Sequence, residues 1–385
     1  MTLISTTEEL LRQCQPLYAV EYITIDTEFI RESTFFPELC LIQIAGPEKA
    51  FVIDALSPTL LLQPLFDLLQ EPKVLKVFHA ARQDIEIIYH LSGKIPQSIF
   101  DTQIAAMVCG FGESVSYETL VMQLINRKLD KSQRFTDWRL RPLTDKQIEY
   151  ALGDVVYLRQ VYTKLQKKIA RNDRLDWLKE EMDALYDKKL YFPHPEDAWL
   201  KLKPKKVDSR SLCVLKELAA WRDLEARRLN IPRRHVLSDD VLIELAANKP
   251  RTTEDLQISR AYSKNFHKSS MAETLLAIIE TSLLIPEDLW PKKEASFEGV
   301  DHGSAALDML KLALKLISDK EGVASKLIAN VSDLKRLIRK DYKDESELPL
   351  LHGWRYQIFG EMAVGLLNGV YSLGLENNQI KFLKK

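Results

Sequence analysis

The sequence predicts an α/β domain with a mixed sheet flanked by helices, followed by two all-α helical-bundle domains. Over the first 170 residues, three extended segments joined by short turns precede an alternation of strand and helix patterns. Short turns join antiparallel neighbours and the alternation adds parallel strands, so the sheet is mixed. A segment rich in proline and lysine separates this part from a second half whose apolar residues recur at helical spacing.

The composition is that of an ordinary folded protein. With 385 residues, 46% of them hydrophobic and 28% charged, the chain can form two or three domains and is not disordered. The net charge of −1 means that polyanion binding must come from local patches. The cysteines show neither metal-ligand spacing nor a disulfide framework, which fits a reducing compartment; they are Cys14, Cys40, Cys109 and Cys213. Neither a signal peptide nor a membrane span is indicated, so we expect a cytoplasmic protein with no membrane partner.

The first long strand, 22–30, carries two acids at alternate positions. Ile23, Ile25, Thr27 and Phe29 would form its packed face, and Asp26 and Glu28 would project together from the other, beside Tyr22 and Thr24. Neighbouring carboxylates repel each other, and Asp and Glu are unfavourable in strands, so a bound cation would relieve a local cost. An amphipathic edge strand with a solvated acidic face explains the stretch as well.

The remaining elements of this domain follow from turn and cap signals. We expect a short helix opened by a capping box at 5–8 and ending near Gln13, strands at 38–45, 50–55, 74–79 and 98–101, and a helix at 80–91. Asp84 falls in the first turns of that helix, just past a strand end, where α/β proteins build sites. An acid favoured there by the helix dipole is the simpler explanation. Asp101 is expected to cap the next helix.

A second strong signal is the helix that follows the capping box Thr144-Asp145-Lys146-Gln147. Its apolar residues recur at steps of three and four up to Ile169, which predicts one buried face. Tyr150 and Asp154 are four residues apart and therefore share a face beside that stripe. A simple hydrogen-bonded pair at the rim of the core would also account for them.

Taken together, these residues form a much narrower pattern, carried by five segments: Ile25-Asp26-Thr27-Glu28-Phe29, Leu41-Ile42-Gln43-Ile44, Val77-Phe78-His79-Ala80-Ala81-Arg82-Gln83-Asp84, Phe100-Asp101-Thr102-Gln103 and Tyr150-Ala151-Leu152-Gly153-Asp154. The chain resembles the DEDD superfamily of RNase H-like 3′-to-5′ exonucleases in its tyrosine-bearing branch, and within it the ribonuclease D family. The resemblance covers residues 20 to 170 and implies a catalytic set of Asp26, Glu28, Asp84, Tyr150 and Asp154.

The resemblance also implies how these residues work. Two divalent ions can activate water and stabilise the charges of phosphodiester hydrolysis, and ligands made only of oxygen favour Mg²⁺ or Mn²⁺. By the family pattern, Asp26 would bridge both ions, Glu28 and Asp154 would complete one site, and Asp84 would hold the other ion partly through water. Tyr150 would orient the attacking water.

The implied function is that of a 3′-to-5′ exoribonuclease that hydrolyses RNA phosphodiesters and releases nucleoside 5′-monophosphates. The expected partner is RNA with a single-stranded 3′ end, with precursor tRNA as the implied substrate, and the expected state is a monomer. Two alternatives remain open: a 3′-to-5′ DNA exonuclease of the same superfamily, and a non-catalytic RNA-binding protein.

The predicted boundaries are an exonuclease domain at 1–190, a linker at 191–209 and helical domains at 210–290 and 300–385. The first helical domain resembles the HRDC module, through Trp221-Arg222-Asp223 to Ile231-Pro232 and Leu237 to Leu245. The second repeats the plan at low identity and departs from it at the Ile-Pro position, so a binding role there is open.

Five further residues are candidates for contact with nucleic acid: Arg227, Arg228, Arg233, Arg234 and Trp138. The arginines form a basic cluster able to neutralise phosphates, although basic residues are also favoured at the end of a helix. Trp138 lies in a segment, 134–139, that resembles the family's segment before the third motif, and packing in the core is its alternative role.

Overall fold

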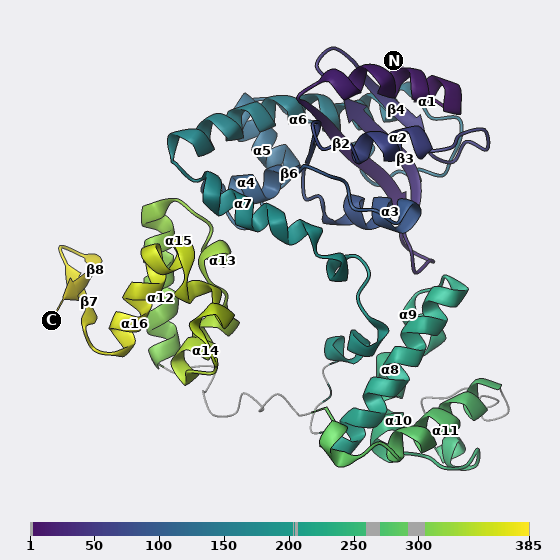
Figure 1. The fold of residues 1–385 in the computed structure, drawn as a ribbon, viewed down its shortest axis with the longest axis vertical. Coiled ribbons are helices and arrows are strands. Elements are labelled where there is room, and N and C mark those ends of the chain that lie inside the picture. The colour runs from purple at the N-terminus through teal and green to yellow at the C-terminus, as the bar shows by residue number, and fades with distance from the viewer. Residues whose placement is uncertain (1–2, 203, 205–206, 259–269, 292–304, 385) are drawn as a thin grey trace.

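The computed structural model describes residues 3–202, 204, 207–258, 270–291 and 305–384. Its centre is a six-stranded sheet with the order β1-β4-β3-β2-β5-β6 (Figure 1). The strands are β1 (Leu3–Ile4), β2 (Tyr22–Ile30), β3 (Glu38–Ala45), β4 (Ala50–Asp54), β5 (Leu75–Phe78) and β6 (Ile99–Asp101). β3 runs antiparallel to β2 and β4, whereas β1, β5 and β6 pair in parallel with their neighbours. The predicted mixed sheet is confirmed.

Helices cover both faces of this sheet. On one face, α1 (Thr7–Cys14), α2 (Gln63–Leu69) and α3 (Arg82–Ser92) pack against the isoleucines of β2 and β3 in a common apolar cluster. Thr6 caps α1 by accepting a hydrogen bond from the backbone N–H of Glu9. The helix is therefore capped by Thr6, one residue after the position at which the capping box was expected to begin.

The other face is covered by the long helix α6 (Asp145–Arg171), with α4 (Thr102–Val108) and α5 (Tyr117–Ile125) packed beside it. The predicted capping box at Thr144 and Gln147 is present. The hydroxyl of Thr24 on β2 donates to the carbonyl of Val155 on α6 over 2.8 Å. This buried hydrogen bond fixes the register of the helix against the strand that carries Asp26 and Glu28.

Beyond α7 (Leu175–Asp183), the chain forms a first helical module of α8 (Ser209–Leu229), α9 (Arg233–Val236), α10 (Asp239–Asn248) and α11 (Ser270–Leu283). Its apolar side chains form a cluster of their own, centred on Leu215, Leu218 and Leu242. Asp208 and Ser238 cap α8 and α10 with their side chains. The expected helices are confirmed here, and the segment 259–269 lies outside the described residues.

A second helical module repeats this order of elements: a long helix, a one-turn helix, a side-chain-capped helix and a final helix. They are α12 (Ala305–Glu321), α13 (Ser325–Ile328), α14 (Val331–Arg339), and α15 (Gly353–Arg355) continuing through a π-turn (Tyr356–Gly360) into α16 (Glu361–Leu367). Unlike the first module, its buried side chains belong to the same apolar cluster as the first domain.

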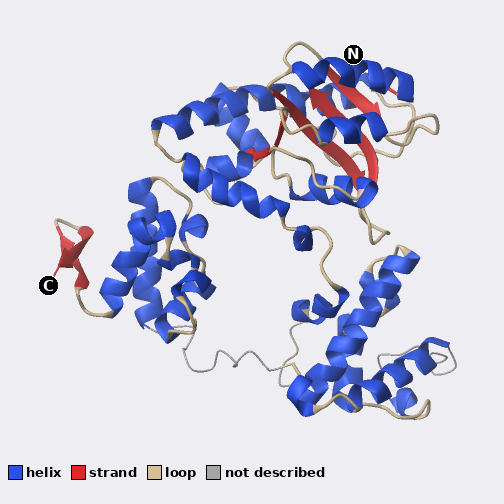
Figure 2. Cartoon of the chain, viewed as in Figure 1, coloured by secondary structure: helices blue, strands red, loops and turns tan. Residues whose placement is uncertain are grey.

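Short 3₁₀ segments connect these elements; they are Gln15–Ala19, Ala184–Tyr186, Lys188–Leu190, Pro195–Lys201, Asp255–Ile258, Glu287–Leu289, Glu345–Glu347 and Pro349–Leu351. The chain then ends in a hairpin of β7 (Tyr371–Glu376) and β8 (Gln379–Lys384), which we did not predict (Figure 2). Asn377 and Asn378 both adopt positive φ, as a type I′ hairpin turn requires. Among the described residues, no helix has the length and apolarity needed to cross a membrane.

Candidate active site

Three carboxylates meet at the centre of the sheet. Asp26 and Glu28 leave β2 on the face that α6 covers, and Asp154 on α6 faces them. Each offers an oxygen, and these oxygens all lie within 4.8 Å of one another. Among the described residues, these three acids form the group that is close enough together to hold a metal ion. The strand spacing and the helix spacing noted in the sequence thus converge on one point.

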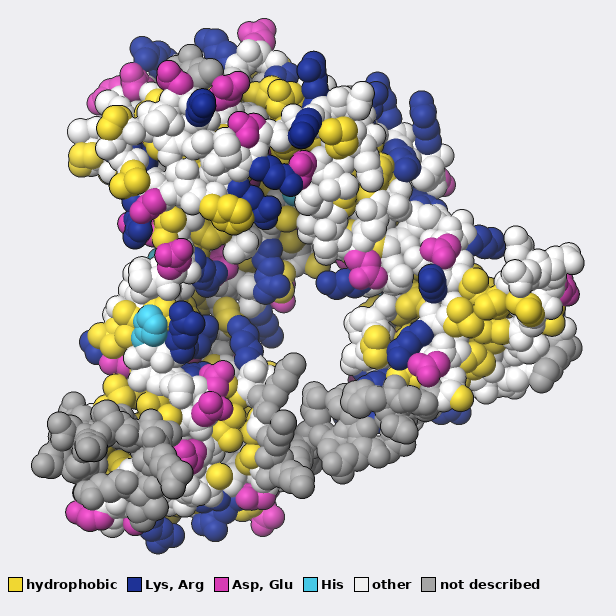
Figure 3. Space-filling model, turned by 180° about the vertical axis from the view of Figure 1, so that it is seen from behind, with side chains coloured by type: hydrophobic (Ala, Val, Ile, Leu, Met, Phe, Trp, Pro, Cys, Tyr) yellow, Lys and Arg dark blue, Asp and Glu magenta, His cyan; other side chains and the backbone are white. Residues whose placement is uncertain are grey.

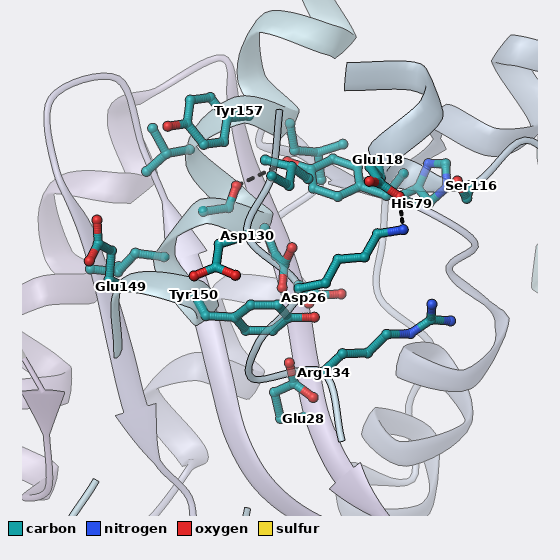
Figure 4. Close-up of a pocket in the computed structure, with 18 of the residues that line it drawn as sticks. Asp26, Glu28, His79, Ser116, Glu118, Asp130, Arg134, Glu149, Tyr150 and Tyr157 are labelled. Atoms are coloured by element: carbon teal, nitrogen blue, oxygen red, sulfur yellow. Dashed lines mark hydrogen bonds and ion pairs between the residues drawn. The ribbon is translucent and has the colours of Figure 1, made fainter. Parts of the chain in front are cut away.

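Tyr150 lies one helical turn before Asp154, and its phenol oxygen points toward Asp26 and Glu28 (Figure 4). The ring of Trp138 lies beneath it, with centroids 6.0 Å apart. Glu149, the preceding residue, points away from the acids. The half-buried phenol therefore has a fixed position at the edge of the carboxylate group.

Asp84 lies in the first turn of α3 and is 6% exposed. It is not part of the group of three; instead, the hydroxyl of Thr27, between the two acids of β2, donates to its Oδ1 over 2.5 Å. Asp101, the predicted helix cap, also accepts from the backbone N–H groups of Ala80 and Ala81. These bonds hold the turn into α3, where Ala80 has φ of 59°, and so set the position of Asp84.

Burial and mutual repulsion make it unfavourable for all four carboxylates near the site to be negatively charged at once. Burial raises the pKa of Asp26 to about 7. Burial, and then the charges of Asp26, Asp154 and Asp84, raise the pKa of Glu28 to about 10. Burial followed by the charge of Asp26 raises the pKa of both Asp84 and Asp154 well above the ordinary value. A cation placed among these groups would favour their charged forms and remove the repulsion.

The donor set indicates which cation fits. All the ligand atoms on offer are carboxylate oxygens, which suit Mg²⁺ or Mn²⁺ better than Zn²⁺. Burial and the charge of Asp154 raise the pKa of the Tyr150 phenol above its usual value. The phenol therefore stays protonated and can donate or accept a hydrogen bond, but it is a poor base.

The acids open into a cleft of about 760 Å³ whose lining carries four cations and three further acids, Glu118, Asp130 and Glu149. The four cations are Lys128, Lys131, Arg134 and Lys146. Lys131 pairs with Glu118 on the opposite rim. The sequence analysis did not single out these residues, although the run Arg127-Lys128 to Lys131 in a loop before the site helix was a visible signal.

The structure buries two of the side chains that were predicted to contact nucleic acid. Trp138 is 2% exposed and packs with Ile148 and Ala151 in the core beneath α6, so it presents no face to a base. Phe135, three residues earlier, is 91% exposed beside Arg134. Arg227 has a side chain that is 9% exposed, bonded to the buried Asp223 and to the carbonyl of Pro193. It is a structural residue and is not free to bind a phosphate.

The other arginines differ among themselves. Arg233 also pairs with Asp223 but keeps 31% of its side chain exposed, whereas Arg228 pairs with Glu225 on the surface. Arg234 is exposed and forms no ion pair with any described residue. Seen from behind, Lys and Arg side chains gather where the first helical module meets the first domain (Figure 3). Contact of these three arginines with nucleic acid stays a prediction.

Comparison with known proteins agrees with this geometry. Residues 1–170 match the 3′-5′ exonuclease family and residues 211–279 match the HRDC domain. The fold and the acidic site together define the chain as a protein of the 3′-5′ exonuclease class, which carries an HRDC domain.

The relatives narrow this class. The chain is 44% identical to the ribonuclease D of Bartonella henselae, over 99% of this chain and 93% of that one. It is 43% identical to the ribonuclease D of Nitrobacter hamburgensis, over 99% of this chain and 98% of that one. The structure of Escherichia coli RNase D, an exoribonuclease involved in structured RNA processing, superimposes with a TM-score of 0.84 at 28% identity and covers 96% of this chain and 98% of its own. This chain belongs to the ribonuclease D family.

Proposed function

We propose that the protein is a metal-dependent 3′-to-5′ exoribonuclease that removes nucleoside 5′-monophosphates from the single-stranded 3′ ends of structured RNA, precursor tRNA included. The observation that carries the proposal is the group of three carboxylates within 4.8 Å of one another, on a family framework of 3′-5′ exonucleases. The relatives named ribonuclease D, and the RNA-processing role of the Escherichia coli protein, support RNA as the substrate.

In this proposal, Asp26, Glu28 and Asp154, with Asp84 beside them, would hold two divalent ions. Bound Mg²⁺ or Mn²⁺ would supply a water of lowered pKa and would stabilise the charge on the phosphate and on the departing 3′ oxygen. After burial, the charge of Asp26 is the largest cause that raises the pKa values of Glu28, Asp84 and Asp154, which supports a shared role for Asp26 among these acids.

Two residues position the reacting groups. Tyr150 keeps its proton because its pKa is raised, so it orients the attacking water by a hydrogen bond and does not remove the proton. Thr27 donates to one oxygen of Asp84 and leaves the other oxygen available. The cations in the cleft lining would neutralise the phosphates that precede the scissile bond.

The experiment is a time course on a hairpin RNA with a single-stranded 3′ tail and on the equivalent DNA, each labelled at the 5′ end. Mg²⁺, Mn²⁺ and EDTA are compared, and products are resolved to single nucleotides. We expect stepwise shortening of the RNA that stops at the stem and is absent in EDTA. Preferential shortening of the DNA would support a DNA exonuclease, and no shortening with either metal would support a non-catalytic binding protein.

A matched pair of variants tests the site itself. Asp26→Ala should lower the cleavage rate by about 10³-fold or more, because metal ions contribute several kcal/mol of charge stabilisation in such reactions. Glu149→Ala removes a carboxylate from the same cleft that points away from the group. It should cleave at nearly the normal rate. Equal activity of the two variants would contradict the assignment of the site.

A further inference from the structure

A buried glutamine beside the active site has no hydrogen-bond partner. Gln43 on β3 is 0% exposed, and neither its Oε1 nor its Nε2 bonds to any described residue. A buried amide left without partners destabilises a fold, so such groups are rare and call for a reason. An apolar residue of the same shape would suit the folded state better, which suggests that the amide is kept for a function.

The sheet register shows which group the amide can reach. Gln43 lies directly opposite Asp26 of β2 on one side and opposite Val52 of β4 on the other. Opposed residues point to the same face of a sheet, and their Cβ atoms are about 5 Å apart. All three side chains therefore lie under α6, and Asp26 is the polar member of the row.

The other neighbours do not compete for the amide. Val52 belongs to an apolar cluster with Ile148 and Ala151 of α6. The hydroxyl of Thr24, the next polar group along β2, is already bonded to the carbonyls of Ala45 and Val155. Gln43 does not line the cleft, so it cannot touch a substrate there. The carboxylate of Asp26 is the acceptor that the amide can find.

We propose that Gln43 is a positioning residue for the metal site: Nε2 of Gln43 donates to the carboxylate of Asp26 when that carboxylate holds a divalent cation, and so fixes its orientation. This inference rests on the proposed function, because it takes Asp26 as a metal ligand. A ligating carboxylate has two oxygens with several lone pairs, so it can accept from the amide and still bind metal. Partners of this kind orient metal ligands in many sites, and their loss weakens metal binding.

The test replaces the amide with an apolar group of nearly the same shape, Gln43→Met. We expect the affinity for Mn²⁺ alone, measured by the electron paramagnetic resonance signal of the free ion, to fall about 10- to 100-fold. The melting temperature of the metal-free protein should stay the same or rise, because an unpartnered buried amide has been removed. The Mn²⁺ concentration for half-maximal hydrolysis of thymidine 5′-(p-nitrophenyl) phosphate should rise by the same factor.

Gln147→Met is the matched control. Gln147 is also buried, but its Oε1 accepts from the backbone N–H of Thr144 in the capping box of α6. Its replacement should lower the melting temperature and leave the affinity for Mn²⁺ unchanged. The two glutamines should therefore show opposite patterns, which a purely structural role of Gln43 would not produce.

Wild-type affinity for Mn²⁺ in Gln43→Met would overturn the inference, and so would a loss of stability as large as that of Gln147→Met. If the methionine variant does not fold, Gln43→Leu carries the same expectation, and failure of both to fold would assign Gln43 to the core alone. A wild-type protein that neither binds Mn²⁺ nor cleaves RNA would overturn the proposed function as well. An active wild type with an unaffected Gln43→Met would overturn this inference only.

Discussion

The two helical modules share an order of elements but are joined to the catalytic domain in different ways. Side chains of the second module, Leu307 and Leu310 among them, continue the apolar cluster of the first domain. The backbones also meet: the N–H of Ala324 donates to the carbonyl of Met107, and a Cβ added at Gly110 would lie 2.5 Å from the carbonyl oxygen of Gly322. The junction therefore leaves no room for a side chain at Gly110.

Aromatic and charged side chains complete that junction. Trp354 stacks on Trp177 of α7 with centroids 4.3 Å apart, and Arg355 pairs with both Glu180 and Glu181. Arg174 donates to the carbonyls of Val108 and Gly322. The second module is therefore packed as a part of the catalytic body.

The first module has its own core, and polar and aromatic groups connect it to the catalytic domain. The N–H of Phe36, in the loop after β2, donates to the side chain of Asn230 over 3.1 Å. Arg227 and Arg233 lie over the ring of Phe35, and the buried carboxylate of Asp223 holds both arginines. A contact made of polar and cation–π interactions can open without unfolding either partner. The second module therefore shares the core of the catalytic domain, while the first is held to it by contacts that can open.

Matched leucines in the long helix of each module give the largest expected effect. Leu310 on α12 and Leu218 on α8 are both 0% exposed, so either change to alanine should cost about 2–5 kcal/mol of local stability. Leu310→Ala should lower the denaturant concentration at which hydrolysis of thymidine 5′-(p-nitrophenyl) phosphate is lost. Leu218→Ala should leave that midpoint unchanged, because its core is separate. If both variants lowered this denaturant midpoint equally, the two modules would stabilise the active site to the same extent.

The second test opens the contact of the first module. Asp223→Ala leaves two arginines without their shared partner, and breaking a buried pair costs about 3–5 kcal/mol. Because Arg233 is partly exposed, we expect the lower end of that range. Affinity for tailed RNA should fall, whereas hydrolysis of the small ester should not change. Glu225→Ala, which breaks an exposed pair on the same helix, is the control and should affect neither. Loss of ester hydrolysis in Asp223→Ala would mean that this module also supports the site.

The third test asks how much RNA the catalytic body holds by itself. Phe135 is 91% exposed next to Arg134, which lines the cleft, and is placed to stack on an unpaired base, a contact worth about 1–3 kcal/mol. Phe135→Ala should therefore raise KM for tailed RNA by about 5- to 150-fold and leave the small ester unaffected. Leu140→Ala, also exposed on this loop, is the control. An unchanged KM would show that Phe135 does not bind the RNA tail, and the first module would then be the remaining candidate for that contact.

The sequence allowed the fold class to be predicted from local periodicity, and the set of acids from short motifs that resemble those of a known family. It placed Asp26 and Glu28 on one face of a strand, and Tyr150 and Asp154 on one face of a helix, and the structure has them there. The capping box at Thr144 was equally local.

What could not be predicted depends on contacts between distant segments. Trp138 and Phe135 are three residues apart in a loop, and only the position of α6 decides which is buried. The role of Arg227 depends on Asp223 four residues earlier, but also on Pro193 and Phe35 from other parts of the chain. Gln43 was visible only as part of a motif until the strand register placed it opposite Asp26. The terminal hairpin had a local signal, the Asn377-Asn378 turn, that we overlooked.

The smallest expected effect is a difference between the catalytic body and the first module in how stabilisation by Mn²⁺ depends on pH. Because the pKa of Asp26 is raised to about 7, the folded metal-free site takes up protons that the unfolded chain, with its ordinary value of 3.8, releases. This contribution to stability is complete at low pH and is lost as the pH rises through about 7. A bound cation replaces the protons, so Mn²⁺ should raise the melting temperature of the catalytic body more at pH 8 than at pH 6. Each kcal/mol of binding corresponds to about 2–4 °C.

The first module provides the internal reference for this measurement, because it carries none of the clustered carboxylates. Its unfolding, followed separately by hydrogen exchange, should show no such dependence of the Mn²⁺ effect on pH. Asp26→Asn removes the charge at nearly constant shape, so its metal-free catalytic body should melt higher than the wild type at pH 8 and gain little from Mn²⁺. A Mn²⁺ effect that is equal at both pH values, or equal in both regions, would mean that the cation does not bind at the acids. In that case any difference in stability between the catalytic body and the first module would come from packing and not from metal binding.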